Sequence, residues 1–128
     1  MNIQHNNPPR EFPVNLQEGI VLKDCAHIEL APDEQVTFVK ATGSEYDVAA
    51  KAWGYYATPS INGRLRRFNL RTTLVYGKGL LYVMLVDKNC EEEFHDYLSA
   101  EKLELLCWLD EDDTIKAVAN YFTAREND

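Results

Sequence analysis

A tight turn at residues 77–79, Gly-Lys-Gly, separates two strand-like segments and constrains the fold more than any other feature. The preceding segment, 64–76, ends in Thr-Thr-Leu-Val-Tyr, which favours strand, and the following segment, 80–87, is apolar on both faces. Two strands joined by so short a turn pair antiparallel. The sequence therefore predicts an antiparallel pair over 64–76 and 80–87, with 80–87 central in its sheet.

Further elements follow from the spacing of apolar residues. Asn89 with Glu92 resembles a capping box, and the acidic run 91–93 suits the first turn of a helix. Asp112 or Asp113 is predicted to cap a last helix, in which apolar residues recur at intervals of three and four. An Asn-Gly pair at 62–63 predicts a second hairpin turn. The other predicted strands are 18–24, 26–32, 35–41, the end of 45–58, and 103–109.

This order of elements predicts an α+β fold: a single domain with a mostly antiparallel sheet of about five or six strands and two C-terminal helices on one side. The 128 residues fit one domain with its own core. Residues 1–13 are polar and rich in Asn and Pro, which predicts a flexible N-terminal tail. The domain is expected over 14–124, with a disordered C-terminal tail at 125–128.

The composition limits the classes of partner that the protein is expected to bind. A formal charge of −8 opposes nonspecific binding to nucleic acid or anionic lipid, so neither nucleic acid nor membrane is expected as a partner. The apolar runs are shorter than the roughly 18 to 20 residues that span a membrane. The first residues do not resemble a secretory signal. These observations predict a cytoplasmic protein.

Metal and cofactor chemistry is weakly indicated. Three cysteines without a CxxC pair argue against a disulfide framework and a structural zinc site. Whether Cys25 and His27 meet Cys90 and His95 is left open by the spacing. No P-loop, GxGxxG or GxSxG motif is present. The sequence therefore predicts no bound metal and no cofactor.

The candidate site lies in the stretch 52–71. Between residues 40 and 78 the basic residues outnumber the acidic ones by seven to two, against the negative charge of the whole chain. If 64–76 is a strand, Arg67, Asn69 and Arg71 project from one face, and the opposite face, which includes Phe68, is core. Guanidinium groups match carboxylate and phosphate, and aromatic rings can form the wall of a pocket. The predicted ligand-binding residues are Trp53, Tyr55, Tyr56, Ser60, Asn62, Arg64, Arg67, Asn69 and Arg71.

Two structural alternatives compete with that site. The arginines can pair with the acidic residues at 91–93, Asp96 or 110–113, and the aromatic run can belong to the core. A platform for RNA or single strands would also use arginine and stacked rings, but the surrounding negative charge opposes it.

Three function classes follow. The first is a small cytoplasmic binding or accessory domain of bacterial type that holds an anionic small molecule. The second is a protein-interaction subunit that docks a partner, or itself as a homodimer, through the arginine stripe or the acidic C-terminal helices. The third is a small enzyme in which Glu45, Asp47 or Tyr56 acts as acid or base beside the arginines.

Overall fold

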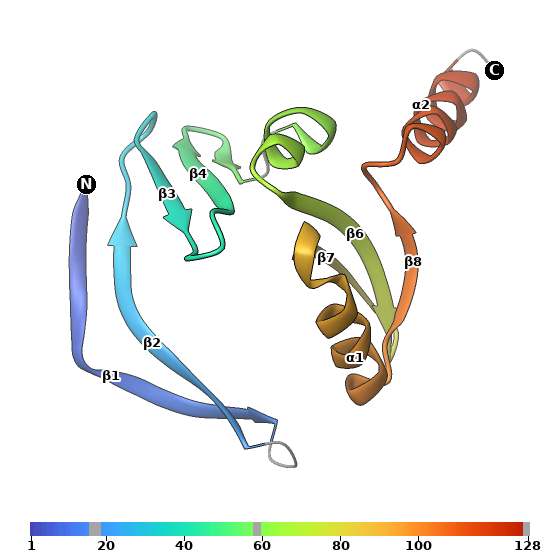
Figure 1. Cartoon of the computed structure of the whole chain (residues 1–128). Helices are drawn as coiled ribbons and strands as arrows, with labels where there is room; N and C mark the ends of the chain where they lie inside the picture. The colour runs from blue at the N-terminus through green and yellow to red at the C-terminus, as the bar shows by residue number, and fades with distance from the viewer. Residues whose placement is uncertain (16–18, 58–59, 127–128) are drawn as a thin grey trace. The chain divides into compact units, whose positions relative to one another are not determined.

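The computed structural model describes residues 1–15, 19–57 and 60–126, which form an α+β fold with mostly antiparallel sheets and helices toward the C-terminus (Figure 1). The elements are, in order, β1 (Asn2–Asn15), β2 (Ile20–Glu29), β3 (Gln35–Val39), β4 (Glu45–Lys51), β5 (Gly54–Tyr56), η1 (Ile61–Leu65), β6 (Leu70–Gly77), β7 (Leu80–Asp87), η2 (Lys88–Cys90), α1 (Glu91–Glu101), β8 (Glu104–Trp108) and α2 (Asp112–Glu126). The α+β class is confirmed. The predicted single sheet of five or six strands is wrong, because these eight strands form three separate sheets, ordered β1-β2, β3-β4-β5 and β7-β6-β8.

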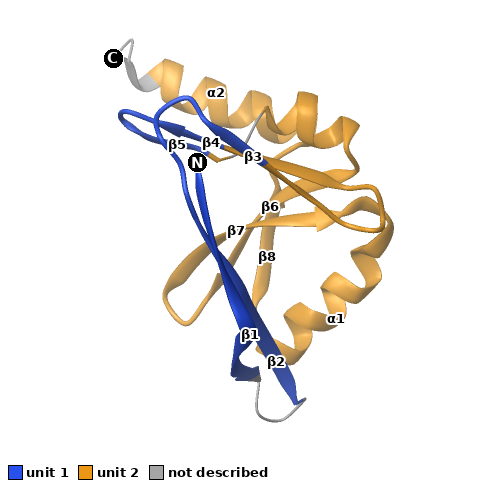
Figure 2. Ribbon diagram, turned by 90° about the vertical axis from the view of Figure 1, so that its left-hand side faces the viewer, with its two compact units in different colours: residues 1–36, 49–56 blue, residues 37–48, 57–128 orange. Residues whose placement is uncertain are grey.

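The chain divides into two compact units (Figure 2). Unit 1 contains Met1–Val36 and Ala49–Tyr56, and unit 2 contains Thr37–Val48 and Ala57–Asp128. Both β3 and β4 therefore contribute residues to each unit. The sequence predicted one domain over 14–124 and did not anticipate this division.

Unit 1 is dominated by a long two-stranded ribbon, β1 paired antiparallel with β2. The predicted flexible tail over residues 1–13 differs from this structure, in which β1 begins at Asn2. The ribbon leaves most of its residues exposed, so its strands lack the apolar alternation that burial of one face would impose. Periodicity consequently could not reveal β1.

The second sheet lies across both units, and its β4 and β5 form a tight hairpin that pairs Lys51 with Gly54. The strand predicted at the end of 45–58 corresponds to β5, while the helical turn considered before it is the strand β4. Residues 58–59 lie outside the described residues, as do 127–128, where part of the predicted C-terminal tail falls. Residues 125–126 of that tail belong to α2.

In unit 2 the central strand is β6, flanked by β7 and β8. The predicted turn at 77–79 is confirmed, with Lys78 and Gly79 at φ of 54° and 76°, the left-handed pair that a two-residue hairpin turn requires. The prediction that 80–87 is central is wrong, because β8 pairs with β6 rather than with β7. Thr72, Thr73 and Val75 of the central strand are fully buried.

The N-terminal half of the predicted strand 64–76 is wrong. Residues 61–65 form a π-helical turn that continues helically through Arg67, and Ser60 Oγ accepts a hydrogen bond of 2.9 Å from the Arg64 amide. Asn69 then adopts a left-handed φ of 65°, and β6 begins only at Leu70. The capping serine favours a helical turn here over the hairpin predicted from Asn62-Gly63. Leu65, which the predicted strand placed on the arginine face, is buried.

Both α-helices belong to unit 2. Helix α1 packs on one face of the β7-β6-β8 sheet, where Phe94 lies 6.1 Å from Trp108 between ring centroids and Leu98 is buried. The predicted capping box is absent, since Cys90 is the N-cap and makes no side-chain cap bond. The predicted last helix is confirmed as α2, which begins at Asp112. Its cap position is Glu111 rather than Asp112 or Asp113, because the Glu111 carbonyl accepts from the Ile115 amide at 2.9 Å. Of the helices in the described ranges, none combines the length and apolar character needed to cross a membrane.

Candidate functional site

Arg71 lies at the centre of an ion-pair cluster in unit 2. Its Nε and Nη2 donate to both carboxylate oxygens of Asp110 at 3.1 and 3.0 Å, and its Nη1 donates to Glu91 at 2.9 Å. Glu111 adds a longer contact of 3.6 Å. The guanidinium carbon lies 4.0 Å from the centroid of the Trp108 ring. Arg71 of β6 thus contacts the second residue after β8 and the first residue of α1.

This cluster fixes the chemistry of Arg71. All three guanidinium nitrogens already donate to carboxylates, and the Asp110 hydrogen bonds hold the pKa of Arg71 above its ordinary value. The alternative that arginines pair with the acidic runs is therefore confirmed for Arg71. Arg71 links three elements through its ion pairs. A ligand could use its donors only by breaking those ion pairs.

Arg64 also forms an ion pair within unit 2. Its Nε donates to Asp47, and its guanidinium carbon lies 4.5 Å over the Phe68 ring. Asp47 is buried and also accepts from Thr37 Oγ1 at 2.7 Å. The Arg64 hydrogen bond lowers the pKa of Asp47, which makes that carboxylate a weaker base. This pairing weakens the idea that Asp47 acts as a general base.

The other predicted ligand-binding residues do not form the expected stripe. Ser60 caps the turn, Asn62 and Arg67 are exposed on it, and Asn69 occupies the left-handed position before β6. Arg67 and Arg71 thus belong to different elements. The aromatic residues of the predicted wall lie in unit 1 and are exposed rather than core, with Trp53 at 71%. These are Trp53, Tyr55 and Tyr56.

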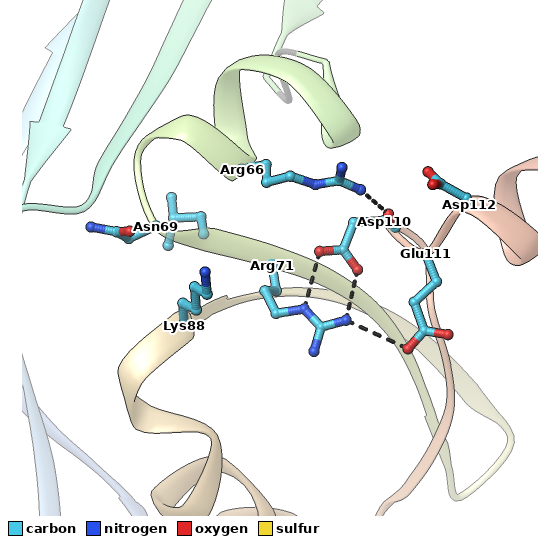
Figure 3. Close-up of a pocket in the computed structure, with 8 residues that line it drawn as sticks. Arg66, Asn69, Arg71, Lys88, Asp110, Glu111 and Asp112 are labelled. Atoms are coloured by element: carbon cyan, nitrogen blue, oxygen red, sulfur yellow. Dashed lines mark hydrogen bonds and ion pairs between the residues drawn. The ribbon is translucent and has the colours of Figure 1, made fainter.

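A pocket of about 340 Å³ opens beside the Arg71 cluster (Figure 3). Arg66 reaches over it to donate to the Asp110 carbonyl oxygen, and Lys88 lies at the end near Asn69. The Lys88 amide donates to the Asn69 carbonyl at 2.8 Å, which closes the pocket beside the paired strands β6 and β7. The full lining is Arg66, Asn69, Leu70, Arg71, Lys88, Asp110, Glu111 and Asp112.

Sequence reasoning found Asn69 and Arg71 in this pocket but missed Arg66 and Lys88. No sequence signal joins them, since the pocket needs the β6–β7 pairing and the return of the chain after β8. The pocket holds three basic and three acidic side chains, so it is not a strongly cationic site. Two charged groups of its lining have no ion-pair partner among the described residues: the Lys88 ammonium and, on the opposite side, the Asp112 carboxylate.

Metal-binding residues do not gather in the described part of the chain. Among residues 1–15, 19–57 and 60–126, no group of three or more His, Cys, Asp or Glu side chains could hold a metal ion. Cys25 and His27 belong to unit 1, whereas Cys90 and His95 belong to unit 2. All three cysteines are free thiols.

Exposed apolar side chains are concentrated on the ribbon of unit 1. Phe12 pairs with Leu22, and the next pair, Pro13 with Val21, projects from the opposite face. Phe12, Val21 and Leu22 are all exposed. The ribbon therefore presents apolar residues on both faces, and no other strand of the described residues pairs with either of its edges.

The sheet of unit 2 also has an uncovered apolar face, which we call the open face and define as Leu74, Tyr76, Leu81 and Val83. Tyr76 pairs with Leu81 and Leu74 with Val83, so the four share a face, whereas Val75 and Trp108 lie on the face under α1. Leu81 and Val83 are each 60% exposed. On helix α2, Val118 and Phe122 are exposed as well.

Comparison with known proteins yields no relative: no protein-family model matches the chain, and no curated protein or solved structure is significantly similar to it. The function is therefore inferred from the geometry alone.

Proposed function

We propose that this protein is a small cytoplasmic interaction subunit that assembles with a second copy of itself through apolar β-surfaces. The observation that carries the proposal is the β1–β2 ribbon, which is two strands wide and exposes apolar side chains on both faces. A two-stranded sheet is marginally stable in water unless further strands or a packed layer support it. Assembly supplies that support.

A second copy suits the ribbon better than an unrelated partner. The outer edge of β2, a strand without proline, carries unpaired backbone donors and acceptors, which template the addition of another strand. When the same edge of two copies meets about a twofold axis, the strands pair antiparallel and the ribbon becomes a four-stranded sheet. This pairing satisfies the backbone groups of the joined edges and brings apolar side chains of neighbouring strands into contact on each face.

The open face of unit 2 supports the same function independently. Contiguous exposed apolar patches are uncommon on monomeric proteins and mark interaction sites. The predicted arginine stripe contributes less than expected to docking, because Arg64 and Arg71 are neutralised within unit 2.

Sedimentation velocity over a range of protein concentrations tests the proposal. The wild type is expected to sediment as a dimer or larger, and a Val21→Thr/Leu22→Thr variant to shift toward monomer, since threonine keeps strand preference but removes apolar area. The matched control is Lys23→Thr, which changes an exposed polar residue of the same strand and is expected to behave as wild type. A wild type that stays monomeric at every concentration would overturn the proposal.

A second candidate function is retention of a small anion between Arg66 and Lys88. It is supported by the pocket beside Arg71, in which the Lys88 side chain has no ion-pair partner among the described residues. Titration with inorganic phosphate, followed by NMR amide shifts, tests it. Saturable shifts at the pocket that vanish in Lys88→Gln and persist in the exposed control Arg67→Gln support the site, and flat titrations reject it.

A further inference from the structure

Beyond assembly, a second pocket in unit 2 combines an apolar wall with polar residues that contact a buried carboxylate. Leu70 and Leu85 form part of its lining, together with Lys40 and Ser44. Leu70 pairs with Asp87 and Thr72 pairs with Leu85, so all four project from the sheet face opposite α1. Asp87 and Thr72 are buried next to this lining, and Asp87 contacts both Lys40 and Ser44.

Asp87 is held by donors on one oxygen only. Its side chain is 4% exposed, and Oδ2 accepts from Thr42 Oγ1 at 2.8 Å and from Ser44 Oγ at 3.1 Å. The Lys40 ammonium lies 3.7 Å from the same oxygen and is itself 69% exposed. This distance exceeds a hydrogen bond, so Lys40 is a weak partner.

The second oxygen has no partner. Asp87 Oδ1 and Thr72 Oγ1 are both buried, and neither forms a hydrogen bond with any described residue. Buried polar atoms are almost always satisfied, and an exception calls for an explanation. A buried carboxylate with one unsatisfied oxygen, in contact with Lys40 and Ser44 of the pocket lining, favours a ligand that brings a hydrogen-bond donor.

The rest of the pocket, about 250 Å³, defines the body of that ligand. Phe38 and Tyr46 stack with ring centroids 6.3 Å apart and planes 26° apart, and Val39 with the two leucines completes an apolar wall. Stacked rings favour a further aromatic ring against them. The volume admits one ring with a short chain, since drug-sized ligands occupy roughly 300 to 1,000 Å³.

The charges favour a cation. Asp87 and Glu45 are acidic and Lys40 is basic, so the surroundings of the pocket carry one excess negative charge. An anionic ligand would be repelled, and a neutral one would leave the excess charge uncompensated. An ammonium group can replace the exposed Lys40 and reach the carboxylate with better geometry.

We propose that this pocket binds a primary amine carried on a single aromatic ring, with the ammonium group on Asp87 and the ring against Phe38 and Tyr46. Lys40 then acts as a built-in competitor for the same carboxylate. A ligand of this class binds more tightly when Lys40 loses its charge. If Lys40 bound the ligand directly, loss of its charge would weaken binding instead.

Phenethylamine is the probe, titrated into full-length ¹⁵N-labelled protein and followed by amide shifts of residues 38–46, 70 and 85. Three comparison compounds separate the features: 2-phenylethanol lacks the charge, phenylacetate reverses it, and butylamine lacks the ring. We expect saturable binding of phenethylamine, with affinity at least about tenfold weaker for each comparison compound, the loss that one charged or stacked contact brings.

Three variants complete the test. Lys40→Gln is expected to tighten phenethylamine binding about two- to fivefold, the range set by an exposed ion pair, and because Lys40 is exposed the fold is retained. Lys78→Gln makes the same charge change at the distant β6–β7 turn and is expected to alter affinity less than twofold. Asp87→Asn is expected to abolish binding.

Several results overturn the proposal. These are flat titrations, equal binding of phenylacetate or 2-phenylethanol, and unchanged or weaker binding in Lys40→Gln. Because none of the variants alters the ribbon, a negative result leaves the assembly proposal standing, and a monomeric wild type leaves this one standing.

Discussion

The guanidinium group of Arg71 is stacked on the indole ring of Trp108, 4.0 Å from its centroid, while it holds Asp110 through two parallel hydrogen bonds. The indole covers one side of the ion pair and limits its hydration. Arg71 therefore contributes to the junction of β6, β8 and α1 through packing as well as charge.

Arg71→Met is expected to destabilise the protein by about 3 kcal/mol, because it leaves the buried Asp110 carboxylate without its partner. Methionine keeps the length needed to cover Trp108, so the loss reports the charge. Urea unfolding at neutral pH measures it. The control Arg67→Met changes an exposed arginine and is expected to cost less than about 0.5 kcal/mol. Equal effects of the two substitutions would show that the Arg71 cluster contributes nothing special.

The Asp47–Arg64 pair predicts a pH dependence of stability. The pKa of Asp47 is lowered below its ordinary value of 3.8, so its stabilising contribution is complete above the unfolded-state pKa and is lost as the pH falls through the folded-state pKa. The Asp47→Asn variant lacks that contribution. Between about pH 5 and pH 2, the free energy of unfolding is therefore expected to fall more steeply in wild type than in the variant. Parallel slopes in urea unfolding would contradict the pairing.

Two adjacent, fully buried threonines of β6 are expected to change the stability of the protein in opposite directions when each is replaced by valine. Thr73 Oγ1 donates to the Cys107 carbonyl at 2.6 Å, whereas Thr72 Oγ1 has no partner among the described residues. Thr73→Val is expected to cost about 1 to 2 kcal/mol, and Thr72→Val to be neutral or stabilising, because it removes a buried hydroxyl that bonds to nothing. Thermal unfolding of both variants decides it. The reverse order would mean that Thr72 is satisfied in solution.

Leu65 tests the π-helical turn that replaced the predicted hairpin. Its side chain is 1% exposed, so Leu65→Ala is expected to cost about 2 to 5 kcal/mol through lost burial and the cavity left behind. A strand over 64–76 would instead have placed Leu65 on the solvent side with the arginines, where the substitution costs little. Chemical denaturation distinguishes the two, with the exposed Leu81→Ala as the low-cost comparison.

Local chemistry explains which parts of the fold were predictable. The turn at Lys78-Gly79 and the helix α2 depend on residues near in sequence, and both were predicted, although the cap of α2 lies one residue earlier than expected. Strand β1 was not, because apolar alternation records burial of one face and the ribbon buries neither. The hairpin predicted from Asn62-Gly63 was wrong for a different reason. The Ser60 hydroxyl accepts a hydrogen bond from the Arg64 amide and so stabilises a helical turn instead.

The candidate site was less predictable, since its geometry comes from residues distant in sequence. Arg71 and Asp110 are separated by 39 positions, and Thr42 and Asp87 by 45. The sequence could indicate that arginines and acids would pair, but not which ones. Lys88 and Arg66 carried no signal at all, because they approach the pocket only after β6 and β7 have paired.

The ribbon also makes the assembly state readable from the backbone itself. Along β2, the amides that face β1 are hydrogen bonded within the chain, while those on the outer edge have no partner strand among the described residues. Deuterium uptake by the outward amides is fast in an isolated chain and slows only when another strand covers them. Alternate residues of the ribbon therefore report two different events. Exchange of the inward amides measures local opening of the hairpin, and exchange of the outward amides measures dissociation of the second copy.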